Sequence, residues 1–263
     1  MIGPRRLALT GAAAIALALG LGASASAAPV FTYTPGAIGL NGSPVTADSA
    51  TLTDYATIVL TPTATGATFT EHGTLNISAF TLGTNAVSAS GLDSTYALYY
   101  TFSGAGTQNT PTIQPGTSGT FTSLNFSFFG APVTGPLSFS PAGGPPSGIG
   151  TSTLLATGSL INGGVQGDAL GQPAANATIT FSPTAAASGF FTSPVPFYNM
   201  AFAGFQNEPN QVSTVGNTVT ITGGGGSATY IPTSVPEPAS IVVFSAALGG
   251  LALLFRRKRN SSV

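Results

Sequence analysis

Apolar residues alternate with threonine and serine through most of the chain, at a period of two rather than at helical spacing. This alternation predicts strands with one buried and one exposed face. The clearest runs cover residues 51–60, 67–80, 95–103, 120–128, 153–160, 177–182 and 218–222. Gly, Pro or Asn bounds each run, which is typical of an antiparallel sandwich or barrel-like fold. We predict an all-β domain over residues 28–231, with a β-sandwich or jelly-roll-like arrangement.

Three local features refine this prediction. Within residues 120–128 the alternation slips by one step at Ser123-Leu124, which indicates a β-bulge. The four glycines at 223–226 fit either a flexible loop or a hairpin turn between strands at 218–222 and 227–231. The stretches 131–150 and 190–217 are rich in Gly, Pro and Ser, so we expect them to be loops.

The N-terminal segment has the pattern of a secretory signal peptide. Arg5 and Arg6 precede an apolar stretch over residues 7–21, and small residues follow. Ala25 and Ala27 each offer a cleavage position, and we place the cut after Ala27, so that residues 1–27 are removed and Ala28 begins the exported chain.

The C-terminal segment has the pattern of a membrane anchor. Residues 239–255 are an uncharged apolar run, which as a helix would span roughly 26 Å and just cross a hydrocarbon core of about 30 Å. The basic residues Arg256, Arg257, Lys258 and Arg259 follow it. Cations are favoured on the cytoplasmic side, so we predict a transmembrane helix at 239–255, a cytoplasmic tail at 256–263 and everything before them outside the cytoplasm.

A Pro-Glu-Pro triplet, Pro236, Glu237 and Pro238, ends the stalk at 232–238 that leads into this apolar run. Triplet, apolar run and basic cluster together resemble the PEP-CTERM sorting signal of Gram-negative bacteria. The resemblance implies that the triplet is recognised by an exosortase, a membrane-embedded cysteine enzyme. It also implies that the inner membrane holds the precursor until processing, after which the protein reaches the cell surface or the extracellular matrix.

Charge is distributed unevenly, because all six Lys and Arg residues lie in the two terminal signals. Between residues 28 and 234 the acidic residues are Asp48, Asp54, Glu71, Asp93, Asp168 and Glu208, which give a formal charge of −6 when His72 is neutral. Such a domain cannot bind nucleic acid or anionic lipid electrostatically. Cysteine is absent, so no disulfide contributes to the stability of this exported domain.

Candidate catalytic chemistry is sparse. Glu71 and His72 are adjacent, but successive residues of a strand point to opposite faces, so they form a poor dyad. The chain has one histidine and no Gly-x-Ser-x-Gly elbow. We therefore predict a non-enzymatic protein without a cofactor or a dedicated metal site. Calcium binding by the carboxylates of Asp48 and Asp54 remains an alternative. A hydrolase using His72 and isolated acids, or a carbohydrate-binding module using Tyr96, Tyr99 and Tyr100, is the alternative.

A looser resemblance concerns the start of the exported domain. The stretch Phe31-Thr32-Tyr33-Thr34-Pro35-Gly36, with Thr46-Ala47-Asp48 and Asp54-Tyr55, is similar to flocculation-associated PEP-CTERM proteins. This resemblance implies a part in cell aggregation through exopolysaccharide. Our prediction is an exported surface or matrix protein, sorted by exosortase and associated with exopolysaccharide, biofilm or floc formation.

Overall fold

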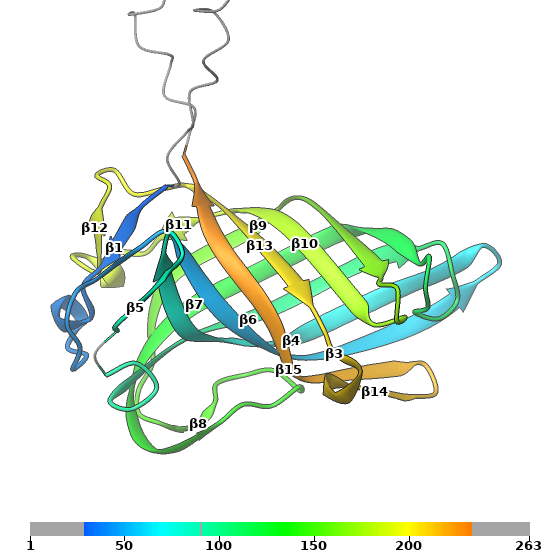
Figure 1. The fold of residues 1–263 in the computed structure, drawn as a ribbon, viewed down its shortest axis with the longest axis horizontal. Coiled ribbons are helices and arrows are strands. Elements are labelled where there is room, and N and C mark those ends of the chain that lie inside the picture. Colours follow the sequence, from blue (N-terminus) through cyan, green and yellow to red (C-terminus); the bar gives the residue numbers. More distant parts are fainter. Residues whose placement is uncertain (1–28, 90, 233–263) are drawn as a thin grey trace, which may run out of the picture.

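The alternating runs form long antiparallel strands in the computed structural model, which describes residues 29–89 and 91–232. Eight of these strands follow one another around a ring (Figure 1). They are β3 (Ser49–Thr63), β4 (Gly66–Leu82), β6 (Tyr96–Gln108), β7 (Ser118–Ser138), β9 (Thr153–Gly167), β10 (Pro173–Thr180), β13 (Met200–Gln206) and β15 (Thr218–Ile231). The prediction of an all-β, antiparallel domain is confirmed.

The arrangement is a closed barrel rather than the predicted sandwich or jelly roll. β7 pairs with β6 along one edge and with β9 along the other, and β15 pairs with both β13 and β3. The ring is therefore complete, whereas a sandwich consists of two separate sheets packed face to face. The sequence pattern could not separate the two because both architectures give strands with one buried and one exposed face.

β15 corrects the prediction for the four glycines, which form neither a loop nor a hairpin turn. The strand runs straight through them, and Gly225 pairs with Thr53 on one side and with Gln206 on the other. The register shifts between Thr222 and Gly224, where Gly223 has a φ of 82°. A Cβ on Gly224 would lie 1.9 Å from Asn207 Oδ1, so a larger residue here would have to displace the buried Asn207 side chain.

The two long segments predicted as loops also contain strands. β7 continues to Ser138 and pairs with β8 (Ser147–Ile149), while residues 190–217 contain β12 (Phe191–Ser193), β13, the 3-10 turn η3 (Pro209–Gln211) and β14 (Val212–Val215). The sequence pattern did not predict β13, because its sequence, MAFAGFQ, is short and lacks the alternation with threonine that marks the other strands. It is nevertheless indispensable, since it joins β10 to β15 in the ring.

The bulge predicted in β7 is confirmed to within one residue. Ala105 and Gly106 of β6 pair with Ser123 and Phe121 respectively, so Thr122 is the extra residue on β7. Residues after the bulge keep the predicted faces, because Phe126 and Phe128 are buried whereas Asn125 is exposed. The alternation of polar and apolar residues therefore located both the strand and its irregularity.

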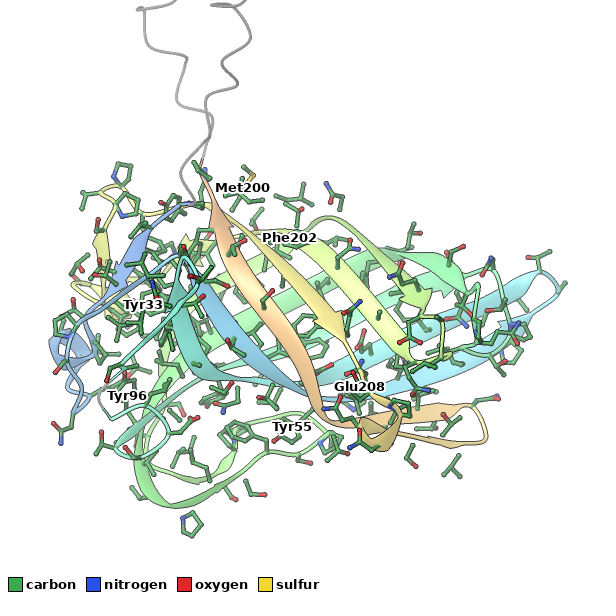
Figure 2. The ribbon with its side chains drawn as sticks, viewed as in Figure 1. Tyr33, Tyr55, Tyr96, Met200, Phe202 and Glu208 are labelled. Carbon is green, nitrogen blue, oxygen red and sulfur yellow. The ribbon has the colours of Figure 1, made fainter. Side chains whose placement is uncertain are left out.

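An aromatic cluster fills the end of the barrel at which β3 begins. A three-stranded sheet of β1 (Phe31–Tyr33), β2 (Val45–Ala47) and β12 covers this end, together with the 3-10 turns η1 (Pro35–Ile38) and η2 (Ala185–Ala187). Tyr33 is 1% exposed, stacks on Phe190 at 4.9 Å and shares a hydroxyl hydrogen bond with Tyr230. Figure 2 shows Tyr33 within this crowded end. Many buried rings in mutual contact therefore take the place of disulfides in this domain.

The remaining short strands pair with ring strands. β5 (Asn85–Val87) pairs with β4, β11 (Ser182–Pro183) pairs with β9, and β14 pairs with β15. The segment between β7 and β8 lies along the outside of the barrel, where Thr57 donates to the Pro141 carbonyl at 2.9 Å and Thr74 to the Gly144 carbonyl at 2.8 Å. The described chain starts and ends at the plugged end of the barrel (Figure 1).

Candidate functional site

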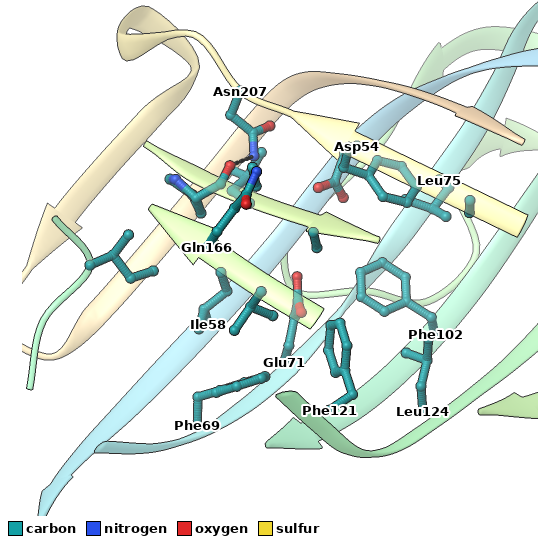
Figure 3. Close-up of a pocket in the computed structure, with 18 of the residues that line it drawn as sticks. Asp54, Ile58, Phe69, Glu71, Leu75, Phe102, Phe121, Leu124, Gln166 and Asn207 are labelled. Carbon is teal, nitrogen blue, oxygen red and sulfur yellow. Dashed lines mark hydrogen bonds between the residues drawn. The ribbon is translucent and has the colours of Figure 1, made fainter. Parts of the chain in front are cut away.

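An apolar cavity of about 100 Å³ lies inside the barrel, beyond the aromatic cluster (Figure 3). Its wall comes from all eight ring strands and from the segments after β6 and β13. The aliphatic and aromatic wall residues include Ile58, Phe69, Phe102, Phe121, Leu124 and Ile221. Their strands project alternate residues inward, which is why positions far apart in the sequence meet here.

Two carboxylates interrupt this apolar wall. Asp54 of β3 and Glu71 of β4 both line the cavity, and their side chains point toward one another across it (Figure 3). In the ladder Asp54 pairs with Leu75 and Glu71 pairs with Ile58, so the two acids are offset by about 13 Å along the strands. The cavity, rather than direct strand pairing, brings the carboxylates together.

The surroundings of both carboxylates favour their neutral forms. Asp54 is 4% exposed and its Oδ1 atom has no hydrogen-bond partner among the described residues. Burial raises the pKa of Asp54 to about 7. Burial, together with the nearby Asp54 carboxylate, raises the pKa of Glu71 to about 8. Removal from water and mutual repulsion both penalise the charged forms, so the pair ionises only around neutral pH.

Two of the other polar side chains of the cavity donate hydrogen bonds to backbone carbonyls. Gln108 donates its Nε2 group to the Thr110 carbonyl at 2.9 Å, and Asn207 donates its Nδ2 group to the Pro173 carbonyl at 2.7 Å. Asn207 is 5% exposed, and its Oδ1 atom has no partner in the described part of the chain. The unpaired buried oxygens of Asp54 and Asn207 are therefore available as acceptors when the Asp54 carboxyl group is ionised.

A second hollow of about 170 Å³ lies at the end of the barrel opposite the aromatic cluster. It shares two wall residues, Ile113 and Pro173, with the internal cavity. Ile113 belongs to the segment between β6 and β7, and Pro173 begins β10. The two hollows are therefore neighbours at this end of the barrel, away from the end where the described chain begins and stops (Figure 1).

His72 confirms the prediction about opposite faces. The side chain of Glu71 points into the barrel, whereas His72 is exposed on the outside and pairs with Thr57 and Ser103. The barrel wall separates the two, so they cannot act as a dyad.

The proposed tyrosine platform is wrong, because all three tyrosines are buried. Tyr96 and Tyr99 are 0% and 1% exposed, and Tyr100 is 8% exposed. Tyr99 stacks on Phe129 at 5.3 Å and bonds Ser152 through its hydroxyl at 2.7 Å, while Tyr100 stacks on Phe128 at 4.3 Å. The rings are structural because their side chains complete the barrel core and the layer that covers it.

Asp48 and Asp54 do not form a calcium site together. Asp48 accepts a hydrogen bond from the backbone N–H of Gly83 at 2.7 Å, at the plugged end. Asp54 lies inside the barrel, about 20 Å further along the strand. Among the described residues, no group of three or more His, Asp or Glu side chains is placed to hold a metal ion.

The outside of β4, β6 and β7 carries a field of small uncharged polar side chains, which we call the outer polar face. Cross-strand pairs Thr68–Thr107, Thr107–Thr120 and Ser103–Asn125 place these groups side by side. The face consists of Thr68, Thr70, Ser103, Thr107, Thr120, Ser123 and Asn125, all exposed. Hydroxyls and an amide supply both donors and acceptors without any net charge.

The sequence pattern did not reveal that Asp54 and Glu71 line the same cavity. A usable signal existed, since each acid stands alone among apolar residues on the inward face of its strand: Leu52, Ala56 and Ile58 beside Asp54, and Phe69 and Leu75 beside Glu71. That the two strands are neighbours and surround an unfilled space depended on the tertiary structure.

The processing residues lie outside the described part of the chain. This applies to the cleavage positions Ala25, Ala27 and Ala28, to the triplet Pro236–Pro238, to the span at 239–255 and to the basic cluster at 256–259. Within residues 29–89 and 91–232, no helix is long and apolar enough to cross a membrane.

Comparison with known families gives one result, a match of residues 234–259 to the PEP-CTERM protein-sorting motif. The matched range contains the Pro236-Glu237-Pro238 triplet and the Arg256–Arg259 cluster. No curated protein and no solved structure matches the chain. The chain thus joins a closed antiparallel barrel to a PEP-CTERM protein-sorting motif, which implies exosortase-dependent sorting out of the cytoplasm.

Proposed function

We propose that this protein is a non-enzymatic component of the cell surface or extracellular matrix, released by exosortase and associated with exopolysaccharide in biofilm or floc. The sorting motif at residues 234–259 carries the extracellular part of this proposal. The outer polar face supports the polysaccharide part. Neutral hydroxyls and amides at regular strand spacing can hydrogen-bond to sugar hydroxyls, which are both donors and acceptors.

Charge also limits the mode of attachment. The exported domain has six acidic residues and no Lys or Arg between residues 28 and 234, so at long range it is repelled by anionic polymer. Raising the salt concentration from 0.01 M to 0.1 M shortens the Debye length from about 30 Å to about 10 Å and weakens this repulsion. Attachment through neutral hydrogen bonds should therefore survive added salt.

The non-catalytic role has its own support. His72 lies outside the barrel, opposite Glu71, and a cavity of about 100 Å³ has room for a group the size of one small ring. Hydrolysis of a glycosidic bond requires two carboxyl groups that flank the bond between two linked sugars, which need more room than this cavity offers. Because Asp54 and Glu71 face one cavity, a hydrolase is the alternative function, and the binding experiment includes a measurement of released sugar.

Retention of the purified protein on isolated exopolysaccharide should persist or strengthen as sodium chloride is raised. The triple variant Ser103→Ala, Thr107→Ala, Asn125→Ala removes hydrogen-bonding groups from the outer polar face and should reduce retention severalfold. A matched variant on another strand, Thr222→Ala with Ser227→Ala, should bind like the parent, as should His72→Ala. Sedimentation of bound protein with the polymer measures all four proteins, with calcium or chelator added in parallel.

Two results would overturn this function. Failure to bind under every salt and calcium condition would remove direct contact with polysaccharide. New reducing ends that disappear in Glu71→Gln or His72→Ala would replace the matrix role with a hydrolytic one.

Replacing Glu237 with Ala should impair processing without changing the fold of the barrel, because the residue belongs to the sorting motif and lies outside the described domain. Mass spectrometry of protein released from cells should find little mature C-terminus in Glu237→Ala and a normal amount in the control Glu208→Ala, whose acid is exposed on the barrel. An unchanged amount and an unchanged C-terminus in Glu237→Ala would contradict recognition through the triplet.

A further inference from the structure

We propose that the internal cavity binds a small organic amine, whose protonated nitrogen pairs with the Asp54 and Glu71 carboxylates while its compact apolar body occupies the rest of the space. This activity is independent of the outer polar face and of attachment to polysaccharide. Burial of the two acids, their unpaired acceptor atoms, the lack of Lys and Arg between residues 28 and 234 and the size of the cavity all support this assignment.

Folding alone does not account for the two acids. An unpaired carboxylate in an apolar interior costs stability, and an aliphatic side chain of similar volume at either position would avoid that cost. Asp54 is 4% exposed and its Oδ1 atom lacks a partner within the described chain. Glu71 retains accessible surface because the cavity, rather than packed side chains, lies in front of it.

The domain offers no positive charge to pair with the two carboxylates when they are ionised. Between residues 28 and 234 the chain contains no Lys or Arg, and the one histidine, His72, lies on the outside. Tyr100 is the only other titratable residue of the cavity wall, and burial raises its pKa, so it carries no charge at neutral pH. A bound cation is therefore what would allow both carboxylates to be ionised.

The polar groups of the cavity specify a hydrogen-bond donor. Asp54, Glu71 and the unpaired Asn207 Oδ1 atom are acceptors, while the Gln108 and Asn207 amide donors are bonded to carbonyls. Gln166, the remaining amide, is exposed to solvent. An alkylammonium group has only donors and a positive charge, so it fits the ionised carboxylates, whereas a carboxylate or phosphate would meet like charge.

The cavity favours an organic cation over a metal ion. Calcium takes about six to eight oxygen ligands, whereas this wall offers two carboxylates and one amide oxygen among aliphatic and aromatic side chains. The volume of about 100 Å³ approaches that of apolar cavities that hold a benzene-sized molecule. Ile113 and Pro173 line both the cavity and the second hollow, so in this proposal the amine enters from that end of the barrel.

Isothermal titration of the purified full chain with isopentylamine tests the proposal, with isopentyl alcohol as the neutral molecule of matched shape. At about pH 9, where both carboxyl groups are ionised, the amine should bind at least about tenfold more tightly than the alcohol. Asp54→Asn and Glu71→Gln should each weaken binding of the amine by about tenfold or more, because each removes a charge-assisted contact. The exposed-acid variant Glu208→Gln should bind the amine like the parent.

A second variant tests the cavity itself. Ala203→Leu places extra atoms in the wall while leaving both carboxylates in place, so it should abolish amine binding. The carboxylate variants remove unpaired buried charge and should fold at least as well as the parent, which keeps the comparison interpretable. Equal binding of amine and alcohol, no binding of either, binding that survives Asp54→Asn and Glu71→Gln, or calcium binding that depends on these residues would overturn the proposal.

Discussion

Replacing Phe128 with Ala should lower the free energy of unfolding by about 3–5 kcal/mol, which is a large share of the usual 5–15 kcal/mol of a folded domain. The side chain is 0% exposed at the base of the aromatic plug. It stacks on Tyr100 at 4.3 Å and contacts Phe181 and Phe190 at centroid distances of 6.5 and 6.3 Å. Truncation would leave a cavity among rings that also pack against other neighbours and cannot collapse into it.

Thermal unfolding of the purified protein measures this effect, with an expected fall in Tm of roughly 10–15 °C. Phe126→Ala should also be severe, since Phe126 is 7% exposed and contacts Tyr100 and Phe181. Phe202→Ala is the matched control, because that ring is 40% exposed on the outer side of β13 and should cost little (Figure 2). If Phe128→Ala were as stable as Phe202→Ala, the aromatic plug would not be the main source of stability.

The stability of the unliganded protein should fall as the pH rises from about 5 to about 9, and Asp54 and Glu71 should account for most of the fall. The pKa of Asp54 rises from 3.8 to about 7 on folding, and that of Glu71 from 4.5 to about 8. The folded state therefore holds protons that the unfolded state has already released in this interval. Stability is complete below the unfolded pKa values and is lost as the pH passes through the folded ones, by an amount on the order of 4 kcal/mol for Asp54.

Denaturant unfolding at several pH values tests this expectation. The double variant Asp54→Asn, Glu71→Gln cannot ionise at these positions, so it should be more stable than the parent by a few kcal/mol at about pH 9 and close to the parent at about pH 4. Glu208→Gln, which changes an exposed carboxylate, should follow the parent curve. Parent stability that stayed level or increased between pH 5 and pH 9 would contradict the assignment of buried, neutral carboxyls. A bound amine should restore part of the lost stability at high pH.

Local pattern predicted a good part of the fold. β3 and β4 were predicted within three residues at each end, the bulge at Thr122 within one residue, and the opposite faces of Glu71 and His72 correctly. These features depend on side-chain alternation between a wet and a dry face, which neighbouring residues reveal by themselves. The sorting motif was readable for a different reason, because a processing enzyme recognises a short contiguous peptide and the family match covers the same residues.

Tertiary structure alone decided the rest. Closure of the ring depends on β13, whose alanines and glycine form a strand only because β10 and β15 pair with its two edges. In the same way β15 stays extended through four glycines, which do not favour a strand by themselves, because β13 and β3 pair with its two edges. Tyr96 and Tyr100 became core residues because the barrel curved around them. By itself the sequence determined an exported, cysteine-free, all-β chain with no positive charge in its domain. Only the folding of β3 and β4 around an unfilled space made Asp54 and Glu71 a site, because the energetics of a carboxylate depend on the groups that surround it in space.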